Sequence, residues 1–472
     1  MCIYLLVDFG STYTKVTAVD LEKEEIAGWS QAHTTIETDI TSGLNDALGK
    51  LSETFGININ KVKGKFASSS AAGGLKMIAI GLVPELTLEA AQRAALGAGA
   101  KVLRGYGFEI DEGIVEEIED AECDIILLSG GTDGGDKSTI IHNAEMLADS
   151  GIICPVLVAG NRVASNKVRS ILEEKGKIVY AADNVLPDLA TLNIEPAQKI
   201  IRDIFISHII KAKGLERAQE FIGKPIIPTP RATLNAAGLL ADGTGNEQGI
   251  GSLLIVEIGG ATTNIHSVSE NSPVTPQAII KGLPEQKLKR TVEGDLGIRY
   301  NARTIYDIVG EETLKSGFEA LMLPDSNIGM NIKKYIGHLN TRVDHIPLSE
   351  AESGLDIALA KSAALLAVER HAGTVKKEYT ISGETTVQYG KNLLDIKNII
   401  GTGGIFKHGK DPERILSVAL FDEKNPWSLK PKKPLAFLDS NYIIYGIGLL
   451  SRVFPDQALR IAKKYLKQTT LQ

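Results

Sequence analysis

The feature that most constrains this chain is a short segment that occurs twice, once at the start and once past the middle. Residues 5–15 are LLVDFGSTYTK, and residues 254–264 are LIVEIGGATTN. Each copy has an apolar run, an acid, a glycine, a hydroxyl-rich turn and a returning β-branched run, which predicts a β-hairpin. The separation is far longer than the period of a solenoid repeat. The duplication therefore predicts two related half-molecules that face each other.

Glycine is abundant, with 47 of 472 residues, against a usual share of about 7%. The glycines gather directly after apolar runs, where they let backbone amides approach a ligand closely. These clusters are Gly10, Gly73–Gly74, Gly130–Gly131, Gly134–Gly135, Gly259–Gly260, Gly401 and Gly403–Gly404.

The first copy carries the groups that a phosphate needs, which are amide donors, hydroxyls and a nearby cation. Asp8 would repel a phosphate directly, but it suits a hydrated Mg²⁺, because this ion keeps waters and binds few carboxylates. A plain hairpin with an exposed polar turn is the alternative. The predicted phosphate ligands are Gly10, Ser11, Thr12, Thr14 and Lys15.

The second copy has the same kinds of group, with Glu257 as its acid. Two such hairpins in one chain favour a site in which both bind the same phosphates. A third strand-to-glycine junction, at residues 399–405, has few polar side chains but offers a flat platform for an adenine or a ribose. A simple strand–helix turn is the alternative for this junction. The predicted ligands in the two segments are Gly259, Gly260, Ala261, Thr262, Thr263, Gly401, Thr402, Gly403 and Gly404.

The pattern between the two copies predicts an inserted module. Residues 84–103 are rich in alanine and leucine and predict a helix. Strand and helix patterns then alternate over residues 124–182, which predicts parallel strands in an α/β module. We therefore expect a first lobe over 1–120, an inserted module over 121–225 and a second lobe over 226–472. The glycine-rich loop 130–135 is either a second ligand or partner site or a tight loop of this module.

Several stretches carry a family resemblance: residues 68–77, 130–135 with 142–143, 292–299, 387–391 and 401–404. With the two hairpins and the late glycine-containing helix at 441–453, the chain resembles the ASKHA superfamily of actin, Hsp70 and sugar kinases. More narrowly, it resembles the MutL/GlmL family of accessory proteins for adenosylcobalamin-dependent glutamate mutase and related mutases. The resemblance implies a two-lobed α/β fold of the actin-like, ribonuclease H-like type with an inserted βαβ module. It also implies ATP and Mg²⁺ as cofactors and mutase subunits as partners.

The resemblance further implies that Asp8 and Glu257 order the Mg²⁺ and that Asp8, Glu257 and Asn264 form the catalytic set. Most members of the family have Asp at the positions of Glu257 and Asn264, and Thr229 stands nearest to the position of the catalytic Glu of Hsp70-like relatives. Since Asn264 lacks a charge, we expect ATP binding with slow hydrolysis, as in a switch that reactivates a mutase. The alternatives are a small-metabolite kinase of the same fold, an ATP-sensing scaffold that never hydrolyses, and an iron–sulfur dehydratase activator.

Composition excludes other classes. The net charge of −7 gives no global attraction to nucleic acid or to anionic lipid, and no apolar run approaches the roughly 20 residues that span a bilayer. Cys2, Cys123 and Cys154 form no close pair in the sequence, which argues against a disulfide scaffold and a cysteine-rich metal site. We expect a cytoplasmic protein. The oligomeric state stays open, with a homodimer as one alternative.

Overall fold

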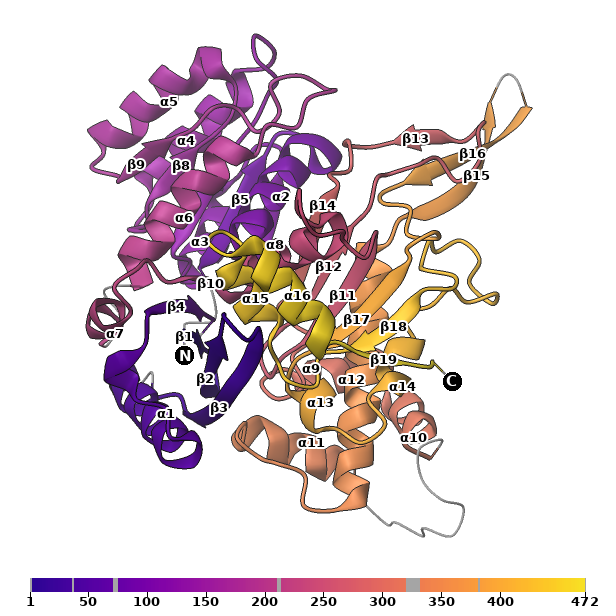
Figure 1. Cartoon of the computed structure of the whole chain (residues 1–472). Coiled ribbons are helices and arrows are strands. Elements are labelled where there is room, and N and C mark those ends of the chain that lie inside the picture. The colour runs from indigo at the N-terminus through magenta and orange to yellow at the C-terminus, as the bar shows by residue number, and fades with distance from the viewer. Residues whose placement is uncertain are drawn as a thin grey trace. The chain divides into compact units, whose positions relative to one another are not determined.

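The computed structural model describes residues 2–35, 38–70, 75–209, 214–319, 332–380 and 383–471 (Figure 1). Residues 71–74 of the predicted stretch 68–77, which include Gly73–Gly74, lie outside these residues. The chain forms two compact units. The larger unit consists of Met1–Ala71, Ala212–Ile280 and Gln286–Gln472, and the smaller unit consists of Ala72–Lys211 with Lys281–Glu285.

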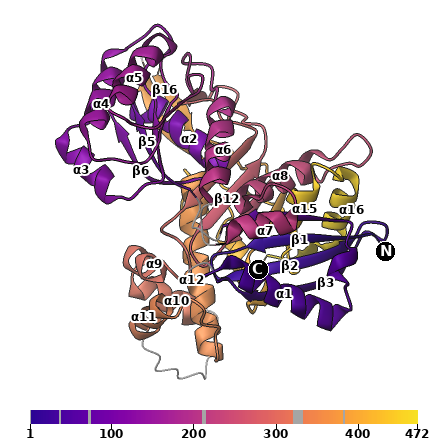
Figure 2. The same cartoon turned by 90° about the vertical axis from the view of Figure 1, so that its left-hand side faces the viewer.

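The first sheet of the larger unit is built around the N-terminal hairpin. Its strand order is β10-β4-β1-β2-β3, in which β1 pairs antiparallel with β2 and parallel with β4. β1 is almost continuously apolar because it is buried along nearly its whole length. Helix α1 (Ile40–Phe55) packs on β3 (Figure 2). The strands are β1 (Ile3–Phe9), β2 (Tyr13–Asp20), β3 (Glu25–His33), β4 (Gly64–Ser69) and β10 (Ile227–Pro228).

The second sheet of the larger unit repeats the first. Its order is β14-β12-β11-β17-β18-β19, and β11 pairs antiparallel with β12 and parallel with β17. Strands β11, β12, β14, β17 and β18 thus correspond to β1, β2, β3, β4 and β10, so the duplication extends far beyond the hairpins. The bounds are β11 (Leu253–Ile258), β12 (Thr263–Val268), β14 (Leu288–Glu293), β17 (Asn398–Thr402), β18 (Leu435–Leu438) and β19 (Lys467–Thr469).

Helices α8 (Thr229–Asp242) and α15 (Ile444–Leu450) follow the corresponding strands β10 and β18 and pack against each other. They approach closely because Gly448 has no side chain: a Cβ added there would lie only 1.8 Å from the Ala232 carbonyl oxygen. A small third sheet has the order β13-β16-β15, in which β15 (Thr374–Thr380) pairs antiparallel with β16 (Gly383–Tyr389) and β13 (Ile279–Lys281) lies beside β16. The other described helices of this unit are η1 (Ile59–Lys61), α7 (Leu215–Ile222), α9 (Ala302–Val309), α10 (Glu311–Glu319), α11 (Ile332–Thr341), α12 (Glu350–His371), α13 (Gly404–His408), α14 (Glu413–Ser417) and α16 (Pro455–Tyr465).

The smaller unit is a parallel α/β module, as predicted. Its sheet has the order β6-β5-β7-β8-β9, with every pair parallel. The strands are β5 (Lys76–Gly81), β6 (Lys101–Gly107), β7 (Ile125–Leu128), β8 (Val156–Val158) and β9 (Val179–Ala181), and the helices are η2 (Pro84–Leu88), α2 (Glu89–Ala98), α3 (Glu112–Asp120), α4 (Ser138–Asp149), α5 (Arg162–Glu174) and α6 (Glu195–Ile209).

The structure of this module differs from two local predictions, the start of the module and the end of the helix over 84–103. The sheet reaches back past the predicted boundary at residue 121, because β5 and β6 pair with β7 rather than with the first hairpin. The helix predicted over 84–103 ends at Ala98, where Gly99 adopts a left-handed conformation with φ of 104° and the chain turns into β6. The alanine-rich composition predicted this helix correctly. It could not place the end of the helix, because the following strand β6 is stabilised by pairing with β5, which is distant in the sequence.

The predicted α/β class and its two related lobes are confirmed by the two corresponding sheets and the separate parallel module. Among the described helices, none combines the length and the apolar character needed to cross a bilayer.

Candidate functional site

The two repeated hairpins have the same turn. In the first, the Gly10 N–H donates to the Tyr13 carbonyl at 3.1 Å, and in the second the Gly259 N–H donates to the Thr262 carbonyl at 2.9 Å. A Cβ at Gly10 would lie 2.7 Å from the Tyr13 carbonyl oxygen, so this tight turn needs glycine. The sequence match between the copies is therefore also a match of backbone geometry.

The acids occupy the same register position in the two hairpins. Asp8 lies opposite Lys15 in the first ladder, and Glu257 lies opposite Asn264 in the second. Each acid therefore stands two residues before the first glycine of its turn and faces the polar residue that the returning strand supplies. The duplicated fold thus brings a carboxylate to the base of each glycine turn.

The tips of the two turns lie close together in the larger unit. A Cβ added at Gly260 would lie 3.6 Å from the Thr12 hydroxyl oxygen, so the two predicted phosphate turns approach each other directly. Several predicted ligands at these tips are partly exposed and open to a bound molecule: Ser11, Thr12, Gly259, Gly260, Ala261 and Thr262.

The predicted stretch 292–299 supports the second turn from behind. The amides of Arg299 and Tyr300 both donate to the Gly260 carbonyl at 2.9 Å. The Arg299 guanidinium in turn forms an ion pair with the buried Asp356 at 2.5 Å. These contacts keep the Gly260 carbonyl occupied and hold the second turn against the segment that carries Arg299.

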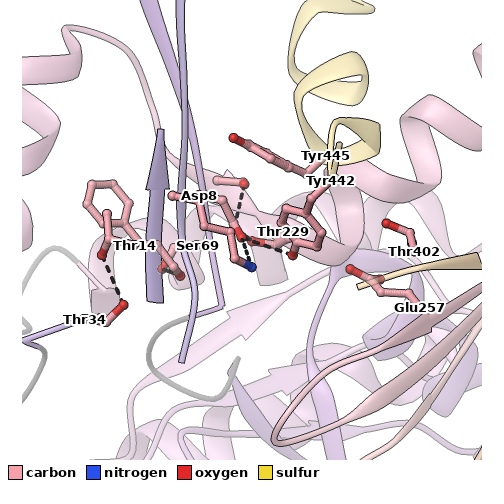
Figure 3. A network of polar contacts seen from close by, with 12 residues as sticks. Asp8, Thr14, Thr34, Ser69, Thr229, Glu257, Thr402, Tyr442 and Tyr445 are labelled. Carbon is pink, nitrogen blue, oxygen red and sulfur yellow. Dashed lines mark hydrogen bonds and ion pairs between the residues drawn. The ribbon is translucent and has the colours of Figure 1, made fainter. Parts of the chain in front are cut away.

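Asp8 is the most heavily coordinated group of the site (Figure 3). Its side chain is 1% exposed. Oδ1 accepts hydrogen bonds from Ser68 Oγ at 3.0 Å and Thr229 Oγ1 at 2.6 Å, and Oδ2 accepts from the Tyr442 hydroxyl at 3.3 Å. The Lys15 ammonium lies 3.7 Å from Oδ2. Oδ1 is thus fully engaged, whereas Oδ2 has only long contacts and retains capacity for a cation or its water.

Lys15 connects this acid to the rest of the site. Its ammonium lies 3.6 Å from the centroid of the Tyr442 ring. Burial lowers the pKa of Lys15, and the nearby charges of Asp8, Glu257 and Asp439 oppose that shift. The same acids, after burial, raise the pKa of Tyr442. The field of both hairpin acids therefore reaches the same lysine and tyrosine.

Glu257 is held by two side chains of the second lobe. Thr233 Oγ1 donates to Oε1 at 3.4 Å, and His266 Nε2 lies 3.0 Å from Oε2. Burial lowers the pKa of His266 despite the attraction of Glu257, so at neutral pH an uncharged imidazole donates from Nε2. Glu257 is thus oriented by hydrogen bonds without being neutralised by a charged histidine.

Asn264 faces a buried arginine. Its Oδ1 accepts from the Arg290 guanidinium at 3.1 Å. Burial lowers the pKa of Arg290 to about 9, and the charge of Glu257 opposes that shift. The amide oxygen at this position is therefore committed to a protein partner.

Two of the predicted phosphate hydroxyls also have partners inside the protein. Thr14 Oγ1 lies 3.1 Å from Thr34 Oγ1 (Figure 3), and Thr263 Oγ1 donates to the Leu296 carbonyl at 2.7 Å. Both threonine side chains are fully buried. The structure thus separates these two residues from the partly exposed residues at the turn tips that are also predicted to bind phosphate.

The third glycine junction lies beside the second hairpin. Gly403 has φ of 116°, and a Cβ there would lie 2.2 Å from the Ile258 carbonyl oxygen. Thr402 Oγ1 donates to Asp439 Oδ2 at 2.9 Å. Asp439 also accepts from the amides of Ile443 and Ile444 at the start of α15, and burial raises its pKa. The junction is therefore rigidly tied to α15.

Sequence reasoning missed most of the partners that orient the acids. Thr229 and Thr233 lie one turn apart on α8, and each donates to one of the two hairpin acids. This spacing at a helix start is a detectable signal, whereas Ser68 and Tyr442 give none, since the fold brings them from distant segments. Within the described residues, no cluster of three or more His, Cys, Asp or Glu side chains is arranged to hold a metal.

Comparisons with known proteins place the chain in a family. The MutL protein family matches residues 4–466. A curated relative, Protein MutL from Clostridium tetanomorphum, is 48% identical over 467 residues and covers 99% of both chains. Solved structures with similarity include an activator of 2-hydroxyisocaproyl-CoA dehydratase from Clostridium difficile with bound ADPNP (11% identity, 99% of each chain, TM-score 0.33) and a ligand-bound xylulose kinase from Lactobacillus acidophilus (12% identity, 99% of this chain and 93% of that one, TM-score 0.36). The whole-length match and the 48% identity establish that this chain belongs to the MutL protein family.

Proposed function

We propose that this protein binds Mg·ATP between the repeated hairpins and acts as an accessory protein that reactivates or assembles an adenosylcobalamin-dependent mutase of the glutamate mutase type. The observation that carries the nucleotide proposal is the pair of matched acid–glycine turns, whose tips are so close that a Cβ added at Gly260 would lie 3.6 Å from the Thr12 hydroxyl oxygen. Membership in the MutL protein family supports the accessory role.

The polyphosphate would lie against the partly exposed turn tips, with the Lys15 ammonium supplying positive charge. An anion would also raise the depressed pKa of Lys15 by compensating the cost of its burial. The base would lie against the glycine platform, of which Gly404 is exposed. Bound Mg²⁺ would neutralise part of the triphosphate charge.

The donor set fits a hydrated Mg²⁺, because two carboxylates at matched positions and few direct ligands are what this ion requires. Asp8 would hold it through Oδ2, the carboxylate oxygen with only long contacts. Glu257 would contribute from the second hairpin, with its orientation maintained by Thr233 and His266.

Hydrolysis is expected to be slow. The amide of Asn264 is bound to Arg290, and Oε2 of Glu257 accepts from His266. The Asn264 amide cannot act as a base, and the hydrogen bond from His266 makes Glu257 a weaker one, so neither group readily takes a proton from an attacking water. The protein therefore remains in its nucleotide-bound state long enough to act as a switch.

A nucleotide that contacts both hairpins stabilises closure of the two lobes, since a ligand shifts a conformational equilibrium only by its differential affinity for the two states. Coupled to a mutase, such closure would open the client long enough for a damaged corrinoid to leave. The alternative of a scaffold that binds ATP without hydrolysis is favoured by the Asn264–Arg290 contact. Phosphate release in a single turnover distinguishes the two.

Calorimetry tests the nucleotide site. We expect the wild-type protein to bind Mg·ATP and Asp8→Asn to lose at least about tenfold in affinity, since a tenfold loss corresponds to about 1.4 kcal/mol. Asp46→Asn, an exposed change on α1, is the matched control and should bind like the wild type. A flat trace for the wild type, or equal affinity of the Asp8 variant, would rule out the site.

A reconstitution assay tests the accessory role. Inactivated glutamate mutase is mixed with this protein, Mg·ATP and fresh adenosylcobalamin, and an aminomutase serves as a second client. We expect activity to return with ATP and to return less with a non-hydrolysable analogue. If ATP binds but no client recovers and no ATP-sensitive complex forms, the accessory role is wrong while the nucleotide site stands.

A further inference from the structure

The smaller unit brings two of the three cysteines together. Cys123 precedes β7 and Cys154 precedes β8, and these strands are parallel neighbours with Ile126 opposite Val156. Both cysteines therefore come to the same edge of the sheet, and their sulfur atoms lie 3.4 Å apart. The sequence spacing does not reveal this proximity, because residues 31 positions apart meet through strand pairing.

The pair is accessible. Both cysteines are partly exposed rather than buried in the core. The neighbouring Glu122 and Gly151 are exposed, and the side chain of Ile153 is 91% exposed. Cysteines that serve only packing are among the most buried residues in proteins, so this position at the rim favours a chemical role over a purely structural one.

The surroundings favour a thiolate on one member of the pair. The hydrogen bond from Cys154 lowers the pKa of Cys123, whereas that contact and burial raise the pKa of Cys154. Burial and the charge of Asp124 raise the pKa of Cys123 and so oppose its thiolate, whereas the charge of Lys76 favours it. Lys177, whose ammonium donates to the Ile152 carbonyl at 2.7 Å, interacts with Cys154. Cys123 is therefore the more readily deprotonated of the two thiols.

We propose that Cys123 and Cys154 form a reversible disulfide by thiol–disulfide exchange with a low-molecular-weight disulfide. The Cys123 thiolate attacks one sulfur of the external disulfide, whose S–S bond breaks and releases one thiolate. Cys154, after losing its proton, then attacks the Cys123 sulfur and releases the second thiolate. Two cysteines are oxidised and one external disulfide is reduced, and the two cysteine protons end on the two released thiols.

The geometry allows this bond with a local change. The sulfurs must close from 3.4 Å to the roughly 2.05 Å of a disulfide. Two thiolates supply only half of a tetrahedral zinc site, and the described residues contain no larger cluster of metal-binding side chains. The disulfide would join the edges of β7 and β8 and close a loop around α4.

The test uses the full-length reduced protein and oxidised glutathione. Remaining thiols are alkylated, and the mass of the chain and the peptides are analysed. We expect the wild type to lose two hydrogen atoms, to release two glutathione molecules per chain, to keep one alkylatable thiol at Cys2, and to show a Cys123–Cys154 cross-link that dithiothreitol reverses. The control Cys2→Ser should form the same cross-link.

The variant Cys154→Ser should stop at a glutathione adduct on Cys123 and release one glutathione. The wild-type peptide map remains decisive even if this variant does not fold. Stable adducts on separate cysteines of the wild type, cross-links between chains, or a Cys123–Cys154 bond that forms only in denaturant would each overturn the proposal.

Discussion

Gly403 and Gly404 are adjacent, but the structure has room for a side chain only at Gly404. Gly403 has a positive φ of 116° and lies where any side chain would meet the Ile258 carbonyl, whereas a Cβ at Gly404 would meet nothing within 4 Å. The close approach at Gly403 holds the end of β17 against β11, next to the second hairpin. The shape of the candidate base platform thus depends on one backbone conformation.

We therefore expect Gly403→Ala to lower the free energy of unfolding by about 1–3 kcal/mol, the usual cost of backbone strain at a non-glycine residue, and to weaken Mg·ATP binding. Gly404→Ala is the matched control and should change stability by less than about 1 kcal/mol. Urea unfolding and calorimetry measure both effects. Equal behaviour of the two variants would contradict the role of Gly403.

Lys407 offers a spectroscopic report of nucleotide binding. It lies on α13 directly after the glycine platform, with its ammonium 3.2 Å from the centroid of the Trp29 ring. Burial lowers the pKa of Lys407 to about 8, and the charge of Lys15 adds to this shift. A bound polyphosphate attracts such a cation, so we expect it to alter the contact between Lys407 and the indole.

Mg·ATP should accordingly change the tryptophan fluorescence of the wild type. The chain has two tryptophans, so Trp427→Phe should keep the change and Trp29→Phe should abolish it. A signal that persists in Trp29→Phe would show that it does not come from this contact.

At the scale of elements, the first turns of α8 organise both acids. Thr229 donates to Asp8 at 2.6 Å, and Thr233, one turn later, donates to Glu257 at 3.4 Å. One helix therefore coordinates the two copies of the hairpin. Gly448 of α15 lets the two helices pack closely, and this packing keeps the two hydroxyls in place.

Thr229→Val should lower the free energy of unfolding by about 1.5–3 kcal/mol, the range for a hydrogen bond to a charged group, because Asp8 is buried and loses a short donor. Thr233→Val should cost less, since its bond is longer. Denaturant titration of the two variants tests this order. A larger loss for Thr233→Val would contradict the assignment of Thr229 as the stronger donor.

At the scale of the whole molecule, two buried histidines make stability depend on pH. His371 has Nε2 at 2.8 Å from Ser267 Oγ and Nδ1 at 2.9 Å from Thr291 Oγ1. Burial, with the charges of Lys289 and Lys391, lowers the pKa of His371 well below its ordinary value. Burial also lowers the pKa of His266. Both imidazoles are therefore neutral in the folded protein at neutral pH.

Because the unfolded chain protonates these histidines near pH 6.5 and the folded chain does so only at lower pH, unfolding takes up protons below that pH. The stabilisation is thus present above about pH 6.5 and is lost as pH falls, by about 1.4 kcal/mol per pH unit for each histidine. Urea unfolding at pH 7.5, 6.5 and 5.5 measures the slope. His371→Gln should show a shallower slope, and an unchanged slope would exclude His371 as a source.

The hairpins were predictable because their determinants are local. The acid, the turn glycine and the apolar strands lie within a few residues of each other, so Gly10 and Gly259 close the same turn in both copies. The parallel module was predictable for the same reason, through its alternation of short strands and helices. The end of the helix at Ala98 was not, since β6 forms by pairing with β5.

The partners of the site were decided by tertiary structure alone. Thr229 and Tyr442 reach Asp8 from 221 and 434 positions away, and Cys123 meets Cys154 only because β7 and β8 lie side by side. Local side-chain patterns encode a turn or a strand, whereas the contacts that orient a buried charge depend on the packing of whole segments. The acid and the glycine turn of each hairpin could therefore be predicted from a few consecutive residues. The hydrogen-bond partners and burial of these acids are determined only by the tertiary structure.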